Sequence, residues 1–270
     1  MAFNRALGTL APRVPGFSDP VAVQFLPERY RSKVNHARML LDTASSRSPY
    51  PFWQRGMGIF NQFRTVVLDR AIASSPPEQL VILGAGLDSR AWRMDCLKNT
   101  VVFEVDHPAS QAWKRERSSA LPFQAKEVRF VGMDFERDVL APRLQSAGFD
   151  ARQSTFWLWE GVTMYLRIED VSATLKAAAT LSAPGSHIGF TYLRKQRGRI
   201  PRGLFLAMIG EPLRSAFESA EMTELARSHG WCVASDTTVE DWLKETPGLK
   251  LARYQVGLQW LESIWIGEIE

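Results

Sequence analysis

Residues 80–106, LVILGAGLDSRAWRMDCLKNTVVFEVD, contain the pattern that decides the fold of this chain. The apolar run LVIL predicts a strand that is buried on both faces, and the glycines of GAG end it in a turn. A helix is expected from Asp88, and the second apolar run, VVFEV, predicts another strand that ends on Asp106. Together these features predict a strand, glycine turn, helix, strand unit of a parallel sheet.

The glycine turn and the acidic strand end indicate a nucleoside-binding site. Gly84 and Gly86 let the backbone approach a ligand, and Asp106, about 20 residues further on, suits both hydroxyls of a ribose. The dinucleotide fingerprint needs a third glycine, but Ser89 stands at that position. A pyrophosphate is therefore disfavoured. S-adenosylmethionine, which has a ribose and an adenine but no phosphate, is the better candidate, and a tight turn without a ligand is the alternative.

The same pattern continues along the chain and places carboxylates at three strand ends. Two further strands are expected at 128–133 and 155–159, and the helices that precede them at 108–119 and 136–147. Asp106, Asp134 and Glu160 then follow three successive strands, at the sheet edge where open parallel sheets bind ligands. Carboxylates there suit the sulfonium, ammonium and hydroxyl groups of S-adenosylmethionine. The alternative is that these acids only cap the helices that follow.

Composition excludes several classes of protein. A chain of 270 residues with 45% hydrophobic and 23% charged residues is typical of a soluble globular protein with one sizeable core. The formal net charge is +4. This is mild, and a nucleic-acid-binding protein should also gather its basic residues on one element. Nucleic acid is therefore not an expected partner.

Cysteine and histidine spacing predicts no metal site. Cys96 and Cys232 lie far apart and outside any C-x-x-C motif, and the four histidines lack metal-ligand spacing. The first residues lack the apolar core of a signal peptide, and no run approaches the ~18 apolar residues of a membrane span. We therefore expect a cytoplasmic chain.

We interpret residues 1–270 as a single domain. Its expected parts are a helical cover at 1–78, a cofactor-binding core at 79–193, a lid insertion at 194–221, and a C-terminal helix and strands at 222–270. Residues 1–20, with three prolines and two glycines, favour an arm over the body. The basic run RKQRGRIPR at 194–202 is typical of a solvated surface, and the alternative is a rim that attracts an anionic substrate. A final antiparallel hairpin is expected from residues 231–234 and 249–269.

Several segments carry a family resemblance. ILGAGLDSRAWR, FEVDHP, WLWEGVTMYL, APGSHIGF and GEPLRSAF resemble the leucine carboxyl methyltransferase family, which includes bacterial polyketide O-methyltransferases. The similarity runs from FSDPVAVQFLP, near residue 17, to about residue 231. It implies the α/β fold of class I methyltransferases, in which a mostly parallel seven-stranded sheet has helices on both faces.

The resemblance implies a role for each candidate residue in the nucleoside half of the site. Gly84, Ala85 and Gly86 would line the methionine part of S-adenosylmethionine, and Asp106 would hold the ribose. Asp134 and the backbone of Phe135 would receive the adenine. Phe135 stands where the family commonly has a leucine, which keeps the backbone donor and changes the apolar wall.

The resemblance also implies how the amino-acid end of the cofactor would be bound. Glu160 would face the methionine ammonium, and Arg64 matches the family arginine that pairs with the methionine carboxylate. The residues alone favour a solvated helix arginine at Arg64. The resemblance reverses that interpretation.

The expected activity is transfer of the methyl group to an oxygen of a small-molecule acceptor, which could be anionic. A carboxylate acceptor would need no general base at pH 7, whereas a phenol would need one, and the sequence names no candidate. A protein C-terminal carboxylate is an alternative acceptor. The sequence also leaves open a nicotinamide oxidoreductase, an RNA methyltransferase and a non-catalytic S-adenosylmethionine-binding protein.

Overall fold

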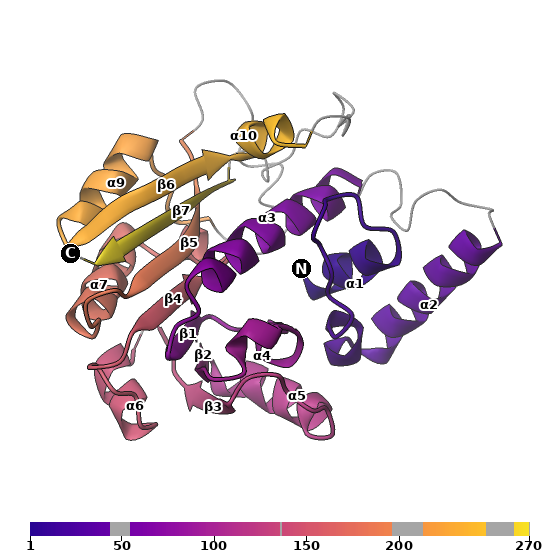
Figure 1. Cartoon of the computed structure of the whole chain (residues 1–270), viewed down its shortest axis with the longest axis horizontal. Coiled ribbons are helices and arrows are strands. Elements are labelled where there is room, and N and C mark those ends of the chain that lie inside the picture. Colours follow the sequence, from indigo (N-terminus) through magenta and orange to yellow (C-terminus); the bar gives the residue numbers. More distant parts are fainter. Residues whose placement is uncertain (44–54, 136, 196–212, 247–261, 270) are drawn as a thin grey trace.

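The chain forms a seven-stranded sheet in the order β3-β2-β1-β4-β5-β7-β6 (Figure 1). The computed structural model describes residues 1–43, 55–135, 137–195, 213–246 and 262–269. All neighbouring strands from β3 to β5 are parallel, and β7 is antiparallel to both β5 and β6. The strands are β1 Gln79–Leu83, β2 Val101–Asp106, β3 Glu127–Gly132, β4 Thr155–Trp159, β5 His187–Leu193, β6 Trp231–Thr238 and β7 Glu262–Ile269. The predicted mostly parallel seven-stranded α/β fold is confirmed.

Both faces of the central strands are apolar, and helices therefore cover both faces of the sheet. Val81 and Trp157 face a core shared with α6, α7 and α9, whereas Leu80 and Phe156 face a core shared with α3, α4 and α10. The helices beyond the N-terminal segment are α3 Arg55–Ser74, α4 Arg90–Arg93, α5 Pro108–Ser118, α6 Leu140–Ser146, α7 Ile168–Thr180, α9 Ser219–Arg227 and α10 Val239–Lys244.

The parallel register brings the carboxylate-bearing strand ends to one edge. Leu83 of β1 pairs with Val105 of β2, so Asp106 lies directly beside the glycine turn that follows β1. β4 lies on the other side of β1, and Glu160 follows its last residue. The strand order reverses between β1 and β4, which is where open α/β sheets bind ligands.

Two predicted helices are shorter in the structure than the sequence pattern indicates. The helix expected from Asp88 is the single turn α4, because the Asp88 carboxylate accepts a hydrogen bond from the Arg90 amide and Met94 is already extended. The helix expected at 136–147 begins only at α6. Before α6, the Asp138 carboxylate accepts a hydrogen bond from the Asp134 amide and closes a turn.

Residues 1–20 differ from the arm that the sequence favours, because they begin with a helix. α1 (Ala2–Leu10) and α2 (Glu28–Asp42) flank a short 3₁₀ turn, Ala22–Phe25. Ala6 and Leu7 of α1 are buried against Ala22 of this turn, so apolar spacing outweighs the prolines that follow. Figure 1 shows α1 beside α3, and Arg5 of α1 donates to the carbonyl of Leu87, which directly follows the glycine turn.

The C-terminal hairpin is confirmed with different bounds. Its first strand, β6, is longer than the expected 231–234, and its second strand is β7. Residues 247–261 lie outside the described residues, as do 196–212, which hold most of the predicted lid and basic run. Among the helices that the structure describes, none is long and apolar enough to cross a membrane.

A charged pair is enclosed in the layer between β2 and α5. Glu104 and Lys114 are each 1% exposed, and Lys114 Nζ donates to Glu104 Oε1 at 2.6 Å. The ammonium also lies over the rings of Phe25 and Trp92. Burial outweighs the attraction of Lys114 and raises the pKa of Glu104 to about 7.

This pKa predicts a pH-dependent stability. The folded-state pKa of Glu104 exceeds its unfolded value, so its contribution is complete below about pH 4.5 and is lost as pH rises through about 7. From pH 5 to pH 8, the free energy of unfolding of the wild type should fall by roughly 2 kcal/mol relative to Glu104→Gln. Urea titrations at several pH values measure this. The exposed control Glu116→Gln should follow the wild type, and parallel wild-type and Glu104→Gln profiles would contradict the assignment.

Candidate active site

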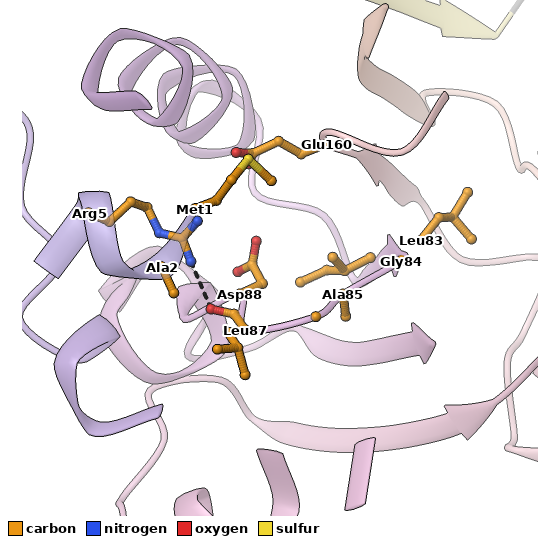
Figure 2. A pocket seen from close by; sticks show the side chains of 11 residues that line it. Met1, Ala2, Arg5, Leu83, Gly84, Ala85, Leu87, Asp88 and Glu160 are labelled. Carbon is orange, nitrogen blue, oxygen red and sulfur yellow. Dashed lines mark hydrogen bonds between the residues drawn. The ribbon is translucent and has the colours of Figure 1, made fainter. Parts of the chain in front are cut away.

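A cavity of about 240 Å³ opens at the carboxyl edge, between the glycine turn and the end of β4 (Figure 2). Its wall consists of Met1, Ala2, Arg5, residues 82–88 and Glu160. Three separate parts of the chain therefore meet there: the start of α1, the segment from β1 to α4, and the residue after β4.

The glycine turn is fixed by backbone hydrogen bonds and by Asp106. The amides of Gly84 and Ala85 both donate to the Val105 carbonyl, at 2.8 and 3.1 Å, and the Gly86 amide donates to Asp106 Oδ2 at 2.5 Å. Gly84 and Gly86 have positive φ angles of 65° and 47°, which other residues rarely adopt. A Cβ at Gly86 would lie 4.0 Å from Asp106 Oδ2 and would occupy the space beside that carboxylate.

Glu160 is held between two buried arginines. Arg64 Nε donates to Glu160 Oε1 at 2.8 Å, and Arg90 Nη2 lies 2.8 Å from Oε2. Arg64 also donates through Nη1 to both oxygens of Glu262, and through Nη2 to Asn61 at 3.2 Å. The Met1 sulfur contacts the same Nη2 atom.

The charge of Glu160 follows from these contacts. Burial by itself would raise its pKa, but the guanidinium groups of Arg90, Arg64 and Arg5 outweigh burial and hold the pKa well below its usual range. Glu160 therefore presents an ionised carboxylate to the cavity at neutral pH.

Arg5 brings a positive charge to the same cavity. Its Nε donates to the buried Asp19 at 2.8 Å, and its Nη2 donates to the Leu87 carbonyl at 2.7 Å (Figure 2). The side chain is 7% exposed, yet it lines the cavity that Glu160 also lines. One cavity thus presents an anion and a cation from two elements that are distant in sequence.

The predicted site residues fall into two groups. Gly84, Ala85, Gly86 and Glu160 line the cavity, and Asp106 adjoins it through the Gly86 amide. Asp134, Phe135 and Arg64 are not part of its wall: Asp134 and Phe135 follow the end of β3, where the Met133 amide donates to the Asp106 carbonyl at 2.9 Å, and Arg64 lies behind Glu160. The binding roles of all eight residues stay predictions.

Three charged residues at the site are not indicated by the sequence pattern. That pattern favours an arm around Arg5 and a helix through Asp88 and Arg90. Asp88 lines the cavity, and Arg90 contacts both Asp88 and Glu160. The available signal is the segment DSRAWR, which places two arginines in an otherwise short and buried stretch.

Comparison with known proteins agrees with this arrangement. The profile of the leucine carboxyl methyltransferase family matches residues 1–179. This chain belongs to the leucine carboxyl methyltransferase family. A Streptomyces coelicolor protein with the provisional name S-adenosyl-L-methionine-dependent methyltransferase is 37% identical over 160 residues, 57% of this chain and 52% of the relative. A Frankia alni protein with the same provisional name is 34% identical over 192 residues, 69% of this chain and 64% of the relative. The chain thus spans about half the length of the first of these relatives.

Solved structures show the same fold at low sequence identity. A provisionally named methyltransferase from Thermobifida fusca is 17% identical with a TM-score of 0.59, covering 99% of this family member and 94% of the other chain. Magnesium protoporphyrin IX methyltransferase from Synechocystis, solved with bound S-adenosylhomocysteine, is 12% identical with a TM-score of 0.53, covering 93% of this family member and 100% of the other chain.

Within the described residues, this family member has no group of three or more His, Cys, Asp or Glu residues suited to a metal ion.

Gly84 should tolerate no side chain. A Cβ there would lie 2.5 Å from Val162 Cγ2 and would also require a positive φ. Gly185 is a matched control, because its φ is 79° but nothing lies within 4 Å of an added Cβ. Gly185→Ala should lower the free energy of unfolding by about 1 kcal/mol and Gly84→Ala by about 3 kcal/mol, as measured by urea denaturation.

The combination of Gly84→Ala with Val162→Ala separates the two causes. If the clash contributes, the double variant should lose less stability than the sum of the single variants. Equal losses for Gly84→Ala and Gly185→Ala would mean that the turn has room for a side chain.

Proposed function

We propose that this chain is an S-adenosylmethionine-dependent O-methyltransferase that acts on a small-molecule acceptor. The observation that supports this most directly is the pairing of Glu160 and Arg5 in one cavity beside a glycine turn. An α-amino acid has an ammonium and a carboxylate, and the cavity wall has the carboxylates of Glu160 and Asp88 for the first and the guanidinium of Arg5 for the second. Family membership supports the same cofactor and the same type of reaction.

The methionine part of the cofactor fits this cavity. Glu160 is ionised and is the natural partner for the ammonium. The family resemblance assigns the carboxylate to Arg64, but Arg64 lies behind the wall and is paired there with two glutamates, whereas Arg5, which is paired with Asp19, is part of the wall. We therefore propose Arg5 as the direct ligand of the carboxylate and Arg64 as a support for Glu160.

The nucleoside part fits the strand ends beyond the turn. Asp106 is half-buried, and its carboxylate borders the space that a Cβ at Gly86 would occupy, so two ribose hydroxyls can reach it. Asp134 and the backbone of Phe135 would then receive the adenine at the end of the neighbouring strand. Carboxylates at all these positions disfavour phosphate, which supports S-adenosylmethionine over a nicotinamide dinucleotide.

The contribution of the protein to the reaction would be alignment and exclusion of water. When bound, S-adenosylmethionine supplies a methyl group on a positively charged sulfur. Glu160 and Arg5 fix one end of that molecule and Asp106 fixes the other, which sets the direction in which the methyl group points. Proximity of this kind can supply up to ~7–11 kcal/mol of the barrier reduction. A carboxylate acceptor would need no base, and we propose this acceptor class ahead of phenols.

Removal of Asp106 tests the nucleoside half of the site. Asp106→Ala deletes an ionised acceptor whose bonds to the ribose are worth about 1.5–3 kcal/mol, so the Kd of S-adenosylhomocysteine should rise about 10- to 100-fold. Isothermal calorimetry measures this, and the melting temperature checks the fold. Asp170→Ala, on the surface of α7, should leave the Kd unchanged. A wild-type Kd in Asp106→Ala would overturn the ribose assignment.

Removal of Arg5 tests the amino-acid half. Arg5→Met should raise the Kd of S-adenosylhomocysteine about 10-fold, because a carboxylate loses its charged partner, and should barely affect 5′-methylthioadenosine, which lacks that end. Parallel titrations of Arg64→Met provide the comparison. A selective loss in Arg64→Met with none in Arg5→Met would assign the carboxylate to Arg64 instead.

The activity itself is tested in two steps. Titration with S-adenosylmethionine and with NAD should show binding of the first and none of the second. Methyl transfer is then followed over a panel of small carboxylic acids, phenols and peptide C-termini. Transfer to a peptide C-terminus alone would favour a protein carboxyl methyltransferase, and binding of NAD alone would overturn the proposal.

A further inference from the structure

Arg90 is a buried side chain beside the cavity that contacts three carboxylates. It is 2% exposed, and its guanidinium reaches carboxylates from three elements. Its Nε donates to Asp69 of α3 at 2.8 Å, its Nη1 donates to Asp88 of the glycine turn, and its Nη2 lies 2.8 Å from Glu160 after β4. The backbone amide of Arg90 donates to the other oxygen of Asp88, also at 2.8 Å.

Two of these three carboxylates line the cavity, and the third does not. Asp88 and Glu160 line it from different elements (Figure 2), whereas Asp69 of α3 pairs with the Arg90 guanidinium and is not part of the cavity wall. Without a cation between them, Asp88 and Glu160 would repel each other. Arg90 therefore holds two acidic groups of the cavity wall in fixed directions.

We infer that Arg90 is a positioning residue, which orients Glu160 and Asp88 toward the amino-acid end of the cofactor without touching the cofactor itself. This inference rests on the proposed S-adenosylmethionine site. Arg64 fixes one oxygen of Glu160 and Arg90 lies against the other, so the direction of the carboxylate is set from both sides.

The contact geometry requires an arginine. The planar guanidinium has donors that point in several fixed directions, and here three different nitrogens serve three different carboxylates. A lysine has a single ammonium at the end of a flexible stem, so it cannot reach all three carboxylates at once. Arg90→Lys therefore keeps the charge and removes the geometry.

Arg93 provides a matched control on the same short helix. It is also buried, and it pairs with Asp69 at 2.6 Å, contacts Ser89 and lies 3.8 Å from Asp19. None of the contacts of Arg93 in the described structure involves a residue that lines the cavity. Arg93→Lys thus perturbs the same helix and the same carboxylate, Asp69, without acting on Glu160.

The test compares two ligands against two variants by calorimetry, with melting temperatures recorded. In Arg90→Lys, the Kd of S-adenosylhomocysteine should rise about 10-fold while that of 5′-methylthioadenosine changes less than about 2-fold. In Arg93→Lys, both Kd values should change less than about 2-fold, although the melting temperature falls. Equal losses for both ligands in Arg90→Lys, or none for either, would overturn the positioning role.

Failure of the proposed S-adenosylmethionine site would look different, because the wild type would then bind neither ligand. If Arg90→Lys does not fold, Asp69→Asn replaces it, since this variant weakens the pairing of Arg90 with a carboxylate that does not line the cavity. Asp69→Asn should weaken S-adenosylhomocysteine about 3-fold and leave 5′-methylthioadenosine unchanged. Equal weakening of the two ligands would again contradict the inference.

Discussion

Glu160 is an ionised carboxylate enclosed by protein, and its pairing with Arg64 and Arg90 is the constraint on which the site depends. A buried charge without a partner costs several kcal/mol, so each element that carries a partner must be placed with respect to β4. Arg64 is carried by α3 and Arg90 by α4, and both are themselves buried. Pairing at Glu160 therefore links α3 and α4 to the carboxyl edge of the sheet.

A second buried carboxylate extends this linkage to the N-terminal segment. Asp19 is fully buried, and it accepts hydrogen bonds from Arg5 at 2.8 Å and from Ser89 at 2.7 Å. It also accepts from the Ala22 amide at 2.9 Å, which fixes the turn after α1. As a result α1 lies against the glycine turn, and its side chains become part of the cavity wall. Residues at the start of α1 are thus part of the proposed binding site.

The strands could be predicted from the sequence, whereas the charged network could not. Apolar runs such as 80–83 and 156–159 are short, uninterrupted and followed by a glycine or an acidic residue, and this pattern is typical of buried parallel strands. The positive charges of Arg5 and Arg90 do not predict that these side chains are buried. Their burial depends on pairing with Asp19, Asp69 and Glu160, and the sequence does not give the positions of these carboxylates in space. The sequence does not predict α1 for a related reason. The apolar face of α1 packs against the 3₁₀ turn and α2, which lie further along the chain.

The candidate site residues also divide into those that the sequence alone indicates and those that it does not. Gly84, Gly86 and Asp106 could be singled out because they lie within about 20 residues of one another in a recurrent unit. Arg64 could be singled out only through the family resemblance, and its contacts with Glu160 and Glu262 depend on residues 96 and 198 positions away.

A crystal structure of the complex with S-adenosylhomocysteine tests the central claim most directly. The account predicts that the ligand ammonium lies within hydrogen-bond distance of Glu160 while Arg90 keeps its contacts with Glu160 and Asp88, and that Asp106 accepts from the ribose hydroxyls. A complex in which the amino-acid end lies away from Glu160, with the Arg64 and Arg90 pairs undisturbed, would contradict it.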